Sequence, residues 1–327
     1  MKQSEQSQPT QETELVRVKL DANESPYNYP DNLYPDRTLM HLREAWGIHE
    51  RIPPQCIYMC AGTEVAVDHC MRLYAMPGKD SVLSVTPTRS VYKVRARINR
   101  LCYREVPLCP SDFSLDVDAL LSAIDDSVKL IFICSPNSPT GNLLGRTSLD
   151  ILLDLYDGMV VIDESYIDFV PQATVLQLLN RHQNLIILRS FSHGWAAAGL
   201  RLAAMVARPQ VISALAQTGY THPVSSPVIR EAEMLLARRL DIDKWTRQLV
   251  EERTKVEIAL RGLPGCVDVY PSVANFLLVR FDQPEAVYSD LLREGIKVRQ
   301  VGQCLRLSIG LPADNSALLS VLRRRVL

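Results

Sequence analysis

The stretch KLIFICSPNSPTG (residues 129–141) decides the fold, because a continuously apolar run passes directly into a polar, proline-containing loop. An apolar run without alternation is typical of a strand in a sheet that is covered on both faces. The loop from Ser135 to Gly141 then lies at the carboxyl end of a strand, where open parallel sheets bind ligands. Prolines stiffen such a loop and Gly141 permits a tight turn, so an ordinary turn is the alternative reading.

Similar apolar runs lie on both sides of this stretch and alternate with helical patterns. The expected strands are residues 57–60, 81–85, 129–134, 159–163, 184–190 and 202–207, with helical patterns at 63–75, 116–124 and 147–156. This alternation predicts an α/β fold with a mainly parallel sheet, in a large domain over residues 31–219. Residues 1–30 are expected to form a tail and an arm, of which 1–14 are a polar, unstructured lead-in.

The composition changes after Pro227, where a long charged helical pattern runs to about Arg261. Further expected elements are strands at 275–280, 296–299 and 304–308 and helices near 284–293 and 313–325. This mixture predicts a smaller α+β domain over residues 220–327.

Composition and charge exclude several classes of function. The 327 residues contain 36 Lys and Arg against 37 Asp and Glu, so no basic excess attracts nucleic acid or anionic lipid. No apolar window is long enough for a membrane helix, and the first residues lack the apolar segment of a secretory signal. The eight cysteines form no CxxC and no histidine pairs with them at metal-ligand spacing. We therefore expect a cytoplasmic protein without a structural metal, a membrane or a nucleic acid as partner.

A second polar sequence follows an apolar strand in VVIDESY (residues 160–166). A carboxylate such as Asp163 at a strand end can pair with a ring nitrogen and keep it protonated. Tyr166, three residues later, offers a hydroxyl to the same edge of a ligand. The alternative is that Asp163 only caps a helix.

Two more segments contain side chains suited to anions. In SFSHGWAAAGLR (residues 190–201), Ser190, Ser192 and Arg201 surround small residues and form a candidate phosphate cradle. Arg306 lies inside the apolar strand of CLRLSIG, and arginine is rarely buried without a partner. We therefore expect Arg306 to meet an anionic ligand.

These motifs together resemble the histidinol-phosphate aminotransferases, which are fold-type I pyridoxal-phosphate enzymes. The four motifs occur in the family's order and approximate spacing, and LDANESPYNYP (20–30), AGTEVAVD (61–68), PTRSVY (87–92) and SVANFLLVR (272–280) extend the resemblance. It covers about residues 18–325. The resemblance implies a large mainly parallel α/β domain, a smaller α+β domain, and pyridoxal or pyridoxamine 5'-phosphate as cofactor. It also implies a homodimer and an amino acid or phosphorylated amine as the small-molecule substrate.

The resemblance also implies a role for each matching residue. Asn137 and Tyr166 would hydrogen-bond the cofactor's phenolic oxygen, and Asp163 would pair with its ring nitrogen. The phosphate would be held by the backbone amides of Gly62, Thr63 and Glu64 and by the side chains of Ser190, Ser192 and Arg201. Tyr34 would reach the phosphate of the neighbouring subunit, and Arg306, with Asn23 nearby, would bind the substrate's carboxylate.

The catalytic position departs from the family, because His193 stands where the family has a lysine. That lysine binds the cofactor covalently and then moves a proton. Imidazole cannot make the covalent bond, but it can still act as an acid or a base. No nearby lysine replaces it, since none occurs between Lys129 and Lys244.

Arg89 is the second departure, because the family has an aromatic residue there that stacks on the cofactor ring. A guanidinium is planar and can also stack, and Arg89 is therefore a candidate cofactor-binding residue. Over a cationic ring, however, it would add positive charge. Facing a phosphate or a substrate anion is the alternative for this side chain.

Three explanations account for His193. The first is a working enzyme that holds the cofactor noncovalently, as pyridoxamine phosphate, with His193 moving the proton. The second is a cofactor- or ligand-binding pseudoenzyme that acts as a regulator or partner subunit. The third is an engineered substitution of lysine, against which the further departures at Ala61, Val65 and Arg89 argue. A fourth reading treats His193 as a plain core histidine. Ser192 and His193 are not a hydrolase nucleophile and base, since no GxSxG elbow is present, and a dinucleotide site has little support, since no GxGxxG follows a strand.

Overall fold

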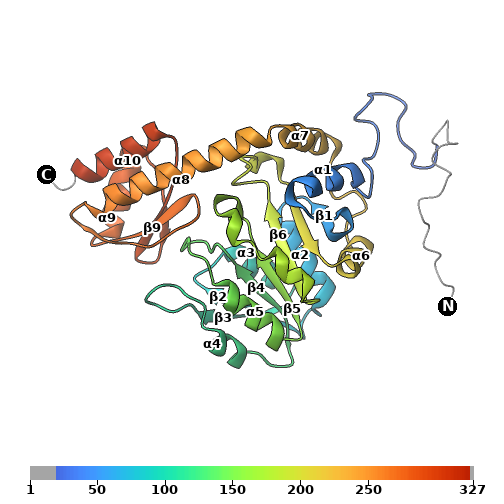
Figure 1. Cartoon of the computed structure of the whole chain (residues 1–327), viewed down its shortest axis with the longest axis horizontal. Helices are drawn as coiled ribbons and strands as arrows, with labels where there is room; N and C mark the ends of the chain where they lie inside the picture. The colour runs from blue at the N-terminus through green and yellow to red at the C-terminus, as the bar shows by residue number, and fades with distance from the viewer. Residues whose placement is uncertain (1–19, 325–327) are drawn as a thin grey trace.

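Two β-sheets organise the protein in the computed structural model, which describes residues 20–324 (Figure 1). The expected lead-in, residues 1–14, lies outside the described residues. The strands of the larger sheet are β1 Ile57–Cys60, β2 Ser81–Thr86, β3 Cys102–Pro107, β4 Val128–Cys134, β5 Met159–Asp163, β6 Leu185–Ser190 and β7 Ala203–Ala207. Their order across the sheet is β1-β7-β6-β5-β4-β2-β3.

The larger sheet is mainly parallel, as predicted. Strands β2 to β6 run parallel, whereas β7 runs antiparallel to both of its neighbours, β1 and β6. All six strands predicted for this sheet are present within a residue of their expected bounds. The edge strand β3 was not expected, because its side chains are mostly exposed or half-buried and only Val106 is buried.

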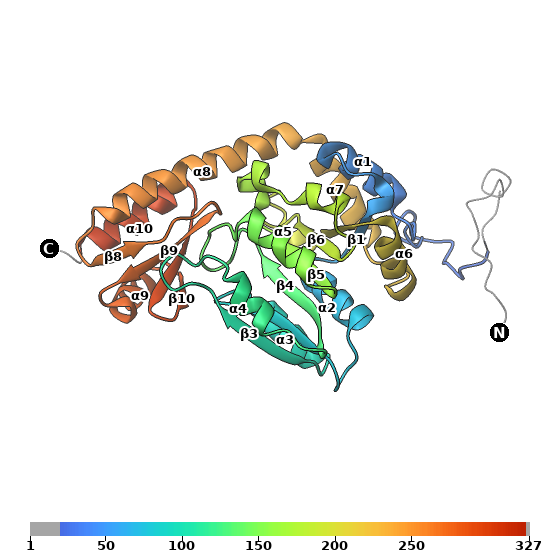
Figure 2. The ribbon, with the colours of Figure 1, turned by 60° about the horizontal axis from the view of Figure 1, so that its bottom comes forward.

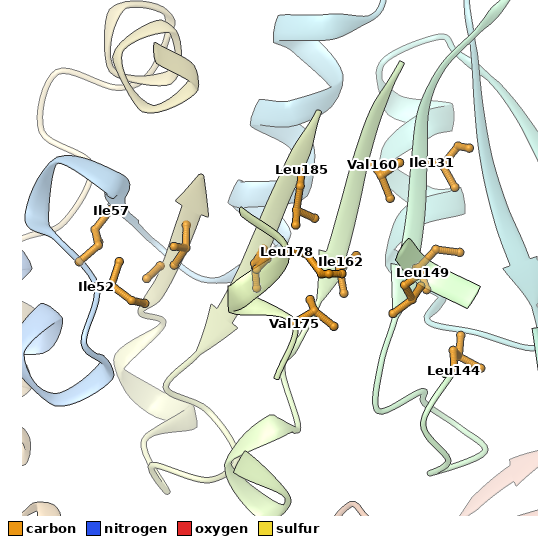
Figure 3. Packing of buried hydrophobic residues seen from close by; sticks show 14 of the residues in the cluster. Ile52, Ile57, Ile131, Leu144, Leu149, Val160, Ile162, Val175, Leu178 and Leu185 are labelled. Atoms are coloured by element: carbon orange, nitrogen blue, oxygen red, sulfur yellow. The ribbon is translucent and has the colours of Figure 1, made fainter. Parts of the chain in front are cut away.

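Helices cover both faces of the larger sheet. Along β5, Val160 and Ile162 belong to the core on one face and Val161 to the core on the other. Figure 3 shows Val160 of β5 beside Ile131 of β4 on the first face. Helices α1 Met40–Glu50, α4 Val117–Ser122 and α5 Arg146–Leu155 pack on that face, and α2 Thr63–Tyr74, α3 Ser90–Ile98 and α6 Pro209–Thr218 on the other. This two-sided burial is why the strand runs are continuously apolar.

The smaller sheet is antiparallel, in the order β10-β11-β9-β8. Its elements are β8 Cys266–Val269, β9 Phe276–Phe281, α9 Pro284–Arg293, β10 Arg299–Val301, β11 Cys304–Ser308 and α10 Pro312–Arg324. The strand predicted at 296–299 overlaps the observed β10 only at Arg299. Pairing begins there, because Arg299 lies opposite Arg306 in a hairpin whose turn contains Gly302.

The predicted long helix is two helices, α7 Ser226–Ala237 and α8 Arg239–Arg261, separated by Arg238, whose backbone is not helical. Figures 1 and 2 both show α8 extending from α7 to the smaller sheet. Leu236 of α7 and Ile242 of α8 belong to the core of the larger sheet, whereas Val256 belongs to that of the smaller sheet. The boundary between residues 219 and 220 stays a prediction, and this packing favours a boundary inside α8.

Short 3₁₀ turns connect several of these elements, at Pro54–Cys56, Ile167–Phe169, Pro171–Ala173, Leu176–Asn180 and Ala198–Leu200. Within residues 20–324, no helix is both long and apolar enough to cross a bilayer. The same residues contain no cluster of three or more His, Cys, Asp or Glu side chains suited to a metal ion.

Candidate active site

Most residues singled out in the sequence gather at one edge of the larger sheet. Strands β1, β2, β4, β5 and β6 all end at this edge, since they run in the same direction. The loops that follow these strands supply Gly62, Arg89, Asn137 and His193, and Asp163 is the last residue of β5. The site therefore lies at the carboxyl ends of the strands, as the loop after residue 134 indicated.

Arg201 reaches the same edge by a different route. It precedes β7, and because β7 is antiparallel, the start of β7 lies beside the ends of β1 and β6. Its backbone has a left-handed conformation, with φ of 52°, which turns the chain into the strand. Because β7 runs in the opposite direction, the residue that precedes it, Arg201, lies beside the loops that follow the parallel strands.

The candidate phosphate cradle is assembled around the start of α2. Gly62 precedes this helix with φ of +92°, and no side chain caps the helix. A Cβ atom on Gly62 would lie 3.0 Å from Nη2 of Arg201, so glycine is needed for both conformation and space. Ser190 accepts a hydrogen bond from the backbone of Ser192 at 3.1 Å. A helix start with a guanidinium beside it is suited to a phosphate.

Asp163 is fully buried at the end of β5 and is bonded on both carboxylate oxygens. Oδ2 accepts from Arg89 and, at 2.8 Å, from the hydroxyl of Tyr92. Oδ1 accepts from the backbone and hydroxyl of Ser165. Arg89 also donates to the hydroxyls of Ser165 at 2.9 Å and Thr63 at 3.2 Å. The arginine at the family's aromatic position thus binds the carboxylate, a contact that was not among the roles expected for it.

Asn137 is also buried and already hydrogen-bonded. Its amide donates to the carbonyl of Pro87 at 2.9 Å and to the hydroxyl of Thr140 at 2.8 Å. Its carbonyl accepts from Thr88 at 2.8 Å. The loop after β4 is thereby tied to the loop after β2.

His193 lies half-buried among these groups and stacks on Tyr166, with ring centroids 4.5 Å apart and an angle of 19° between the planes. Burial, together with the positive charge of Arg89, lowers the pKa of His193 to about 4, while the charge of Asp163 opposes the shift. The imidazole is consequently neutral near pH 7 and available as a proton acceptor. A neutral, half-buried base in a cluster of charges is a candidate catalytic residue, and the role of His193 stays a prediction.

A line of stacked side chains joins the site to the smaller sheet. The edge of Tyr166 meets Phe276 of β9 at a centroid distance of 5.2 Å, and the guanidinium of Arg306 lies 5.0 Å over Phe276. Arg306 donates to Ser138 at 3.1 Å, while its buried Nε has no hydrogen-bond partner among the described residues. An arginine with a free buried N–H is suited to an anionic group of a ligand.

Three predicted residues are not brought into this cluster by the contacts observed. Tyr34 is 60% exposed and stacks on His222, and its role toward a neighbouring subunit stays a prediction. Asn23 is exposed, and its role beside the substrate also stays a prediction. The side chain of Glu64 forms an ion pair with Arg95, and the role of its backbone amide toward a phosphate stays a prediction.

Several contributing residues escaped the sequence reasoning. They are Thr63 through its hydroxyl, Tyr92, Ser138, Ser165 and Phe276. All five lie within motifs already quoted, and for Ser138 and Ser165 the available signal was their closeness in sequence to Asn137 and Asp163. Phe276 lies in an apolar strand, and nothing in its local pattern separates it from a core residue.

A seven-stranded, mainly parallel sheet with this edge site and a smaller α+β unit define a fold-type I pyridoxal-phosphate-dependent transferase. The sequence model of aminotransferase class I and II matches residues 11–322. A histidinol-phosphate aminotransferase of Parabacteroides distasonis is 37% identical over 312 residues, which cover 94% of this chain and 90% of that one. This chain belongs to the class I and II aminotransferase family, and the predicted family is confirmed.

Two solved structures confirm the fold. The histidinol-phosphate aminotransferase of Clostridium acetobutylicum superposes with a TM-score of 0.82 at 20% identity, covering 90% of each chain. That of Sinorhizobium meliloti, solved in complex with pyridoxal-5'-phosphate, also gives 0.82, at 19% identity and covering 90% of this chain and 83% of that one. At these identities the similarity shows the fold alone.

Proposed function

We propose that this chain is an aminotransferase-like enzyme that uses pyridoxal or pyridoxamine phosphate without a covalent bond to the protein. The observation that carries the proposal is a neutral His193 at the lysine's position, next to an intact phosphate cradle. The named relatives support a phosphorylated amine, such as histidinol phosphate, as the substrate. A homodimer and a cytoplasmic location are part of the same proposal.

The residues of the cradle fit the phosphate of such a cofactor. Gly62 leaves room where a side chain would meet Arg201, and the start of α2 presents backbone amides that have no partner within the helix. The part of the site expected to hold the cofactor ring, here called the ring end, is not free in the same way. Asp163 is bound by Arg89, and the Asn137 amide donates to protein acceptors. The site therefore fits the ring only once Arg89 has released the carboxylate.

When bound, the cofactor supplies an electron sink that makes a carbon–hydrogen bond next to nitrogen acidic. In this chain His193 accepts that proton at an imidazole nitrogen and returns it. Tyr166 keeps the imidazole plane fixed by stacking on it. Arg306, with its unpartnered buried Nε, binds the anionic group of the substrate.

A ligand-binding pseudoenzyme is the second candidate, and the Arg89–Asp163 ion pair favours it. The charge of Asp163 is already balanced by Arg89, so a protonated ring nitrogen is not required to balance it. In that case the cradle and Arg306 would bind a phosphorylated ligand without turnover.

Titration and turnover separate the two candidates. Pyridoxamine phosphate is titrated into wild type and into Asp163→Ala, with absorbance as the signal, and 2-oxoglutarate or imidazole acetol phosphate is then added. The enzyme proposal expects binding by the wild type, weaker binding by D163A, and slow conversion of bound pyridoxamine phosphate. Binding without conversion of either keto compound supports the pseudoenzyme. No binding at millimolar ligand contradicts the enzyme proposal and also a pseudoenzyme that binds this cofactor.

A further inference from the structure

Arg89 makes its strongest contact inside the ring end of the site. It lies directly before α3, at the carboxyl end of β2, and its side chain is 17% exposed. Its guanidinium pairs with Asp163 and donates to Ser165 and Thr63. These partners come from the ends of β5 and the start of α2, so the side chain crosses the site from the cradle to the carboxylate.

Asp163 explains why the arginine is held there. A fully buried carboxylate is costly without a cation, and described neighbours other than Arg89 offer it only neutral donors. Tyr92 and Ser165 supply hydrogen bonds but no positive charge. Arg89 is the charged partner of Asp163, and removing it leaves a buried anion uncompensated.

We propose that Arg89 is an internal counter-ion that occupies the ring end of the site, so that cofactor binding requires its exchange from Asp163. This inference rests on the proposed function, in which the ring is held at Asp163. At the cradle, Arg89 donates a hydrogen bond to the hydroxyl of Thr63, and Gly62 and Arg201 are not among its described hydrogen-bond partners. The exchange therefore concerns the ring end of the site.

The competition has a defined effect on affinity. If only the minor population with Arg89 released accepts the ring, the apparent dissociation constant is the intrinsic one divided by that fraction. Minor states are commonly populated at about 0.1–10%. Removing Arg89 should therefore tighten cofactor binding by about tenfold to a thousandfold. A ligand that uses only the cradle should show no such gain.

The test compares two arginines of the same segment. Arg89→Met removes the guanidinium but keeps an unbranched side chain, and Arg97→Met removes an exposed arginine near the end of α3 as the control. Equilibrium dialysis with pyridoxamine phosphate, and separately with inorganic phosphate, is performed on wild type and both variants. We expect R89M alone to bind pyridoxamine phosphate more tightly, and all three proteins to bind inorganic phosphate equally.

Each result decides between the two proposals. Tight binding by R89M with none by wild type supports the inference and contradicts a cofactor-dependent wild type. Wild type binding as tightly as R89M overturns the inference and leaves the proposed function standing. Binding by neither overturns both, and an equal gain for inorganic phosphate shows that Arg89 acts on the cradle instead.

The ion pair is also tested in the ligand-free protein, in case R89M is poorly folded. Thermal unfolding is measured for R89M, Asp163→Asn and the double variant. The inference expects the double variant to unfold at a higher temperature than R89M, because no uncompensated carboxylate remains. Additive losses in this cycle would show that Arg89 and Asp163 are not coupled, and would overturn the inference.

Discussion

At the scale of single residues, the exchange of lysine for histidine at position 193 separates two roles that lysine combines. Covalent attachment is lost, because imidazole forms no stable imine with an aldehyde. The capacity to accept a proton is retained, because burial and the charge of Arg89 lower the pKa of His193 to about 4 and leave it neutral. Stacking on Tyr166 then fixes the orientation of a base that no covalent bond holds.

The first prediction concerns this protonation. NMR titration of the free protein should place the pKa of His193 near 4, and conversion rates should be level down to about pH 5 and fall below it. The unfolded state binds this proton near pH 6.5, so the contribution of His193 to stability is present above 6.5 and is lost as pH falls toward 4. A measured pKa near 6.5 would contradict the buried geometry.

Removal of the base should abolish proton transfer without loss of binding. His193→Ala should slow conversion of bound pyridoxamine phosphate by about 10²–10⁴-fold, the usual contribution of a general base. Stopped-flow absorbance measures the rate, and equilibrium dialysis serves as the control for cofactor affinity. Equal rates in H193A and wild type would exclude His193 as the proton carrier.

Restoring the lysine tests the rest of the pocket. In His193→Lys, pyridoxal phosphate should become covalently attached, because the introduced amine lies at the family's position. Borohydride reduction followed by mass spectrometry should find the adduct at residue 193, and wild type should show none there. Absence of the adduct in H193K, despite a folded protein, would show that the ring end is closed by more than the missing lysine.

At the scale of elements, six strands of the larger sheet were predictable, including β1 at one edge, and the exposed strand β3 at the other edge was not. Burial on both faces makes β4 and β5 continuously apolar, which is visible in the sequence. Strand β3 is half exposed, and its pattern is not distinct. Arg201 was assigned by resemblance, but its position depends on β7 running antiparallel, which no local pattern reveals. The contact of Arg89 with Asp163 spans 74 residues of sequence, so only the fold could show it.

A prediction at this scale concerns the loop after β4 and its contact with the smaller unit. Gly141 has φ of +84° and a Cβ there would lie 2.3 Å from Oγ of Ser272, whereas Gly78 has φ of +76° and open space. Both Gly78→Ala and Gly141→Ala carry the conformational penalty, about 1–2 kcal/mol. In G141A the new methyl group also meets Ser272 of the smaller unit and displaces it. This variant should therefore be less stable than G78A and should bind substrate more weakly. Denaturant unfolding measures both variants, and equal losses would contradict docking at this glycine.

At the scale of the whole molecule, a buried cluster of charges gives stability a dependence on pH. Burial raises the pKa of Asp168 from 3.8 to about 7, although the nearby positive charge of Arg189 acts in the opposite direction. The folded state therefore holds this proton more tightly. The resulting contribution to stability is complete below pH 3.8 and is lost as pH rises through about 7.

The corresponding prediction is that Asp168→Asn stabilises the protein at alkaline pH. The amide keeps the shape of the side chain and cannot ionise, so the unfolding midpoint of D168N should exceed that of wild type at about pH 8. The two midpoints should approach each other as pH falls and coincide below about pH 3.8, where Asp168 of wild type is protonated in both the folded and the unfolded state. Wild type being the more stable at alkaline pH would show that ionised Asp168 is needed in its ion cluster.

Helix α8 gives the molecule a mechanical property. Its 23 residues form a rod about 35 Å long, with one end fixed in the core of the larger sheet through Ile242 and the other carrying the smaller sheet. If the chain bends at Arg238, where the backbone is not helical, a tilt of this rod by about 5° would move its far end by about 3 Å. Arg306 would move with that end, so a small rotation at Arg238 would change the distance between the anion-binding arginine and His193.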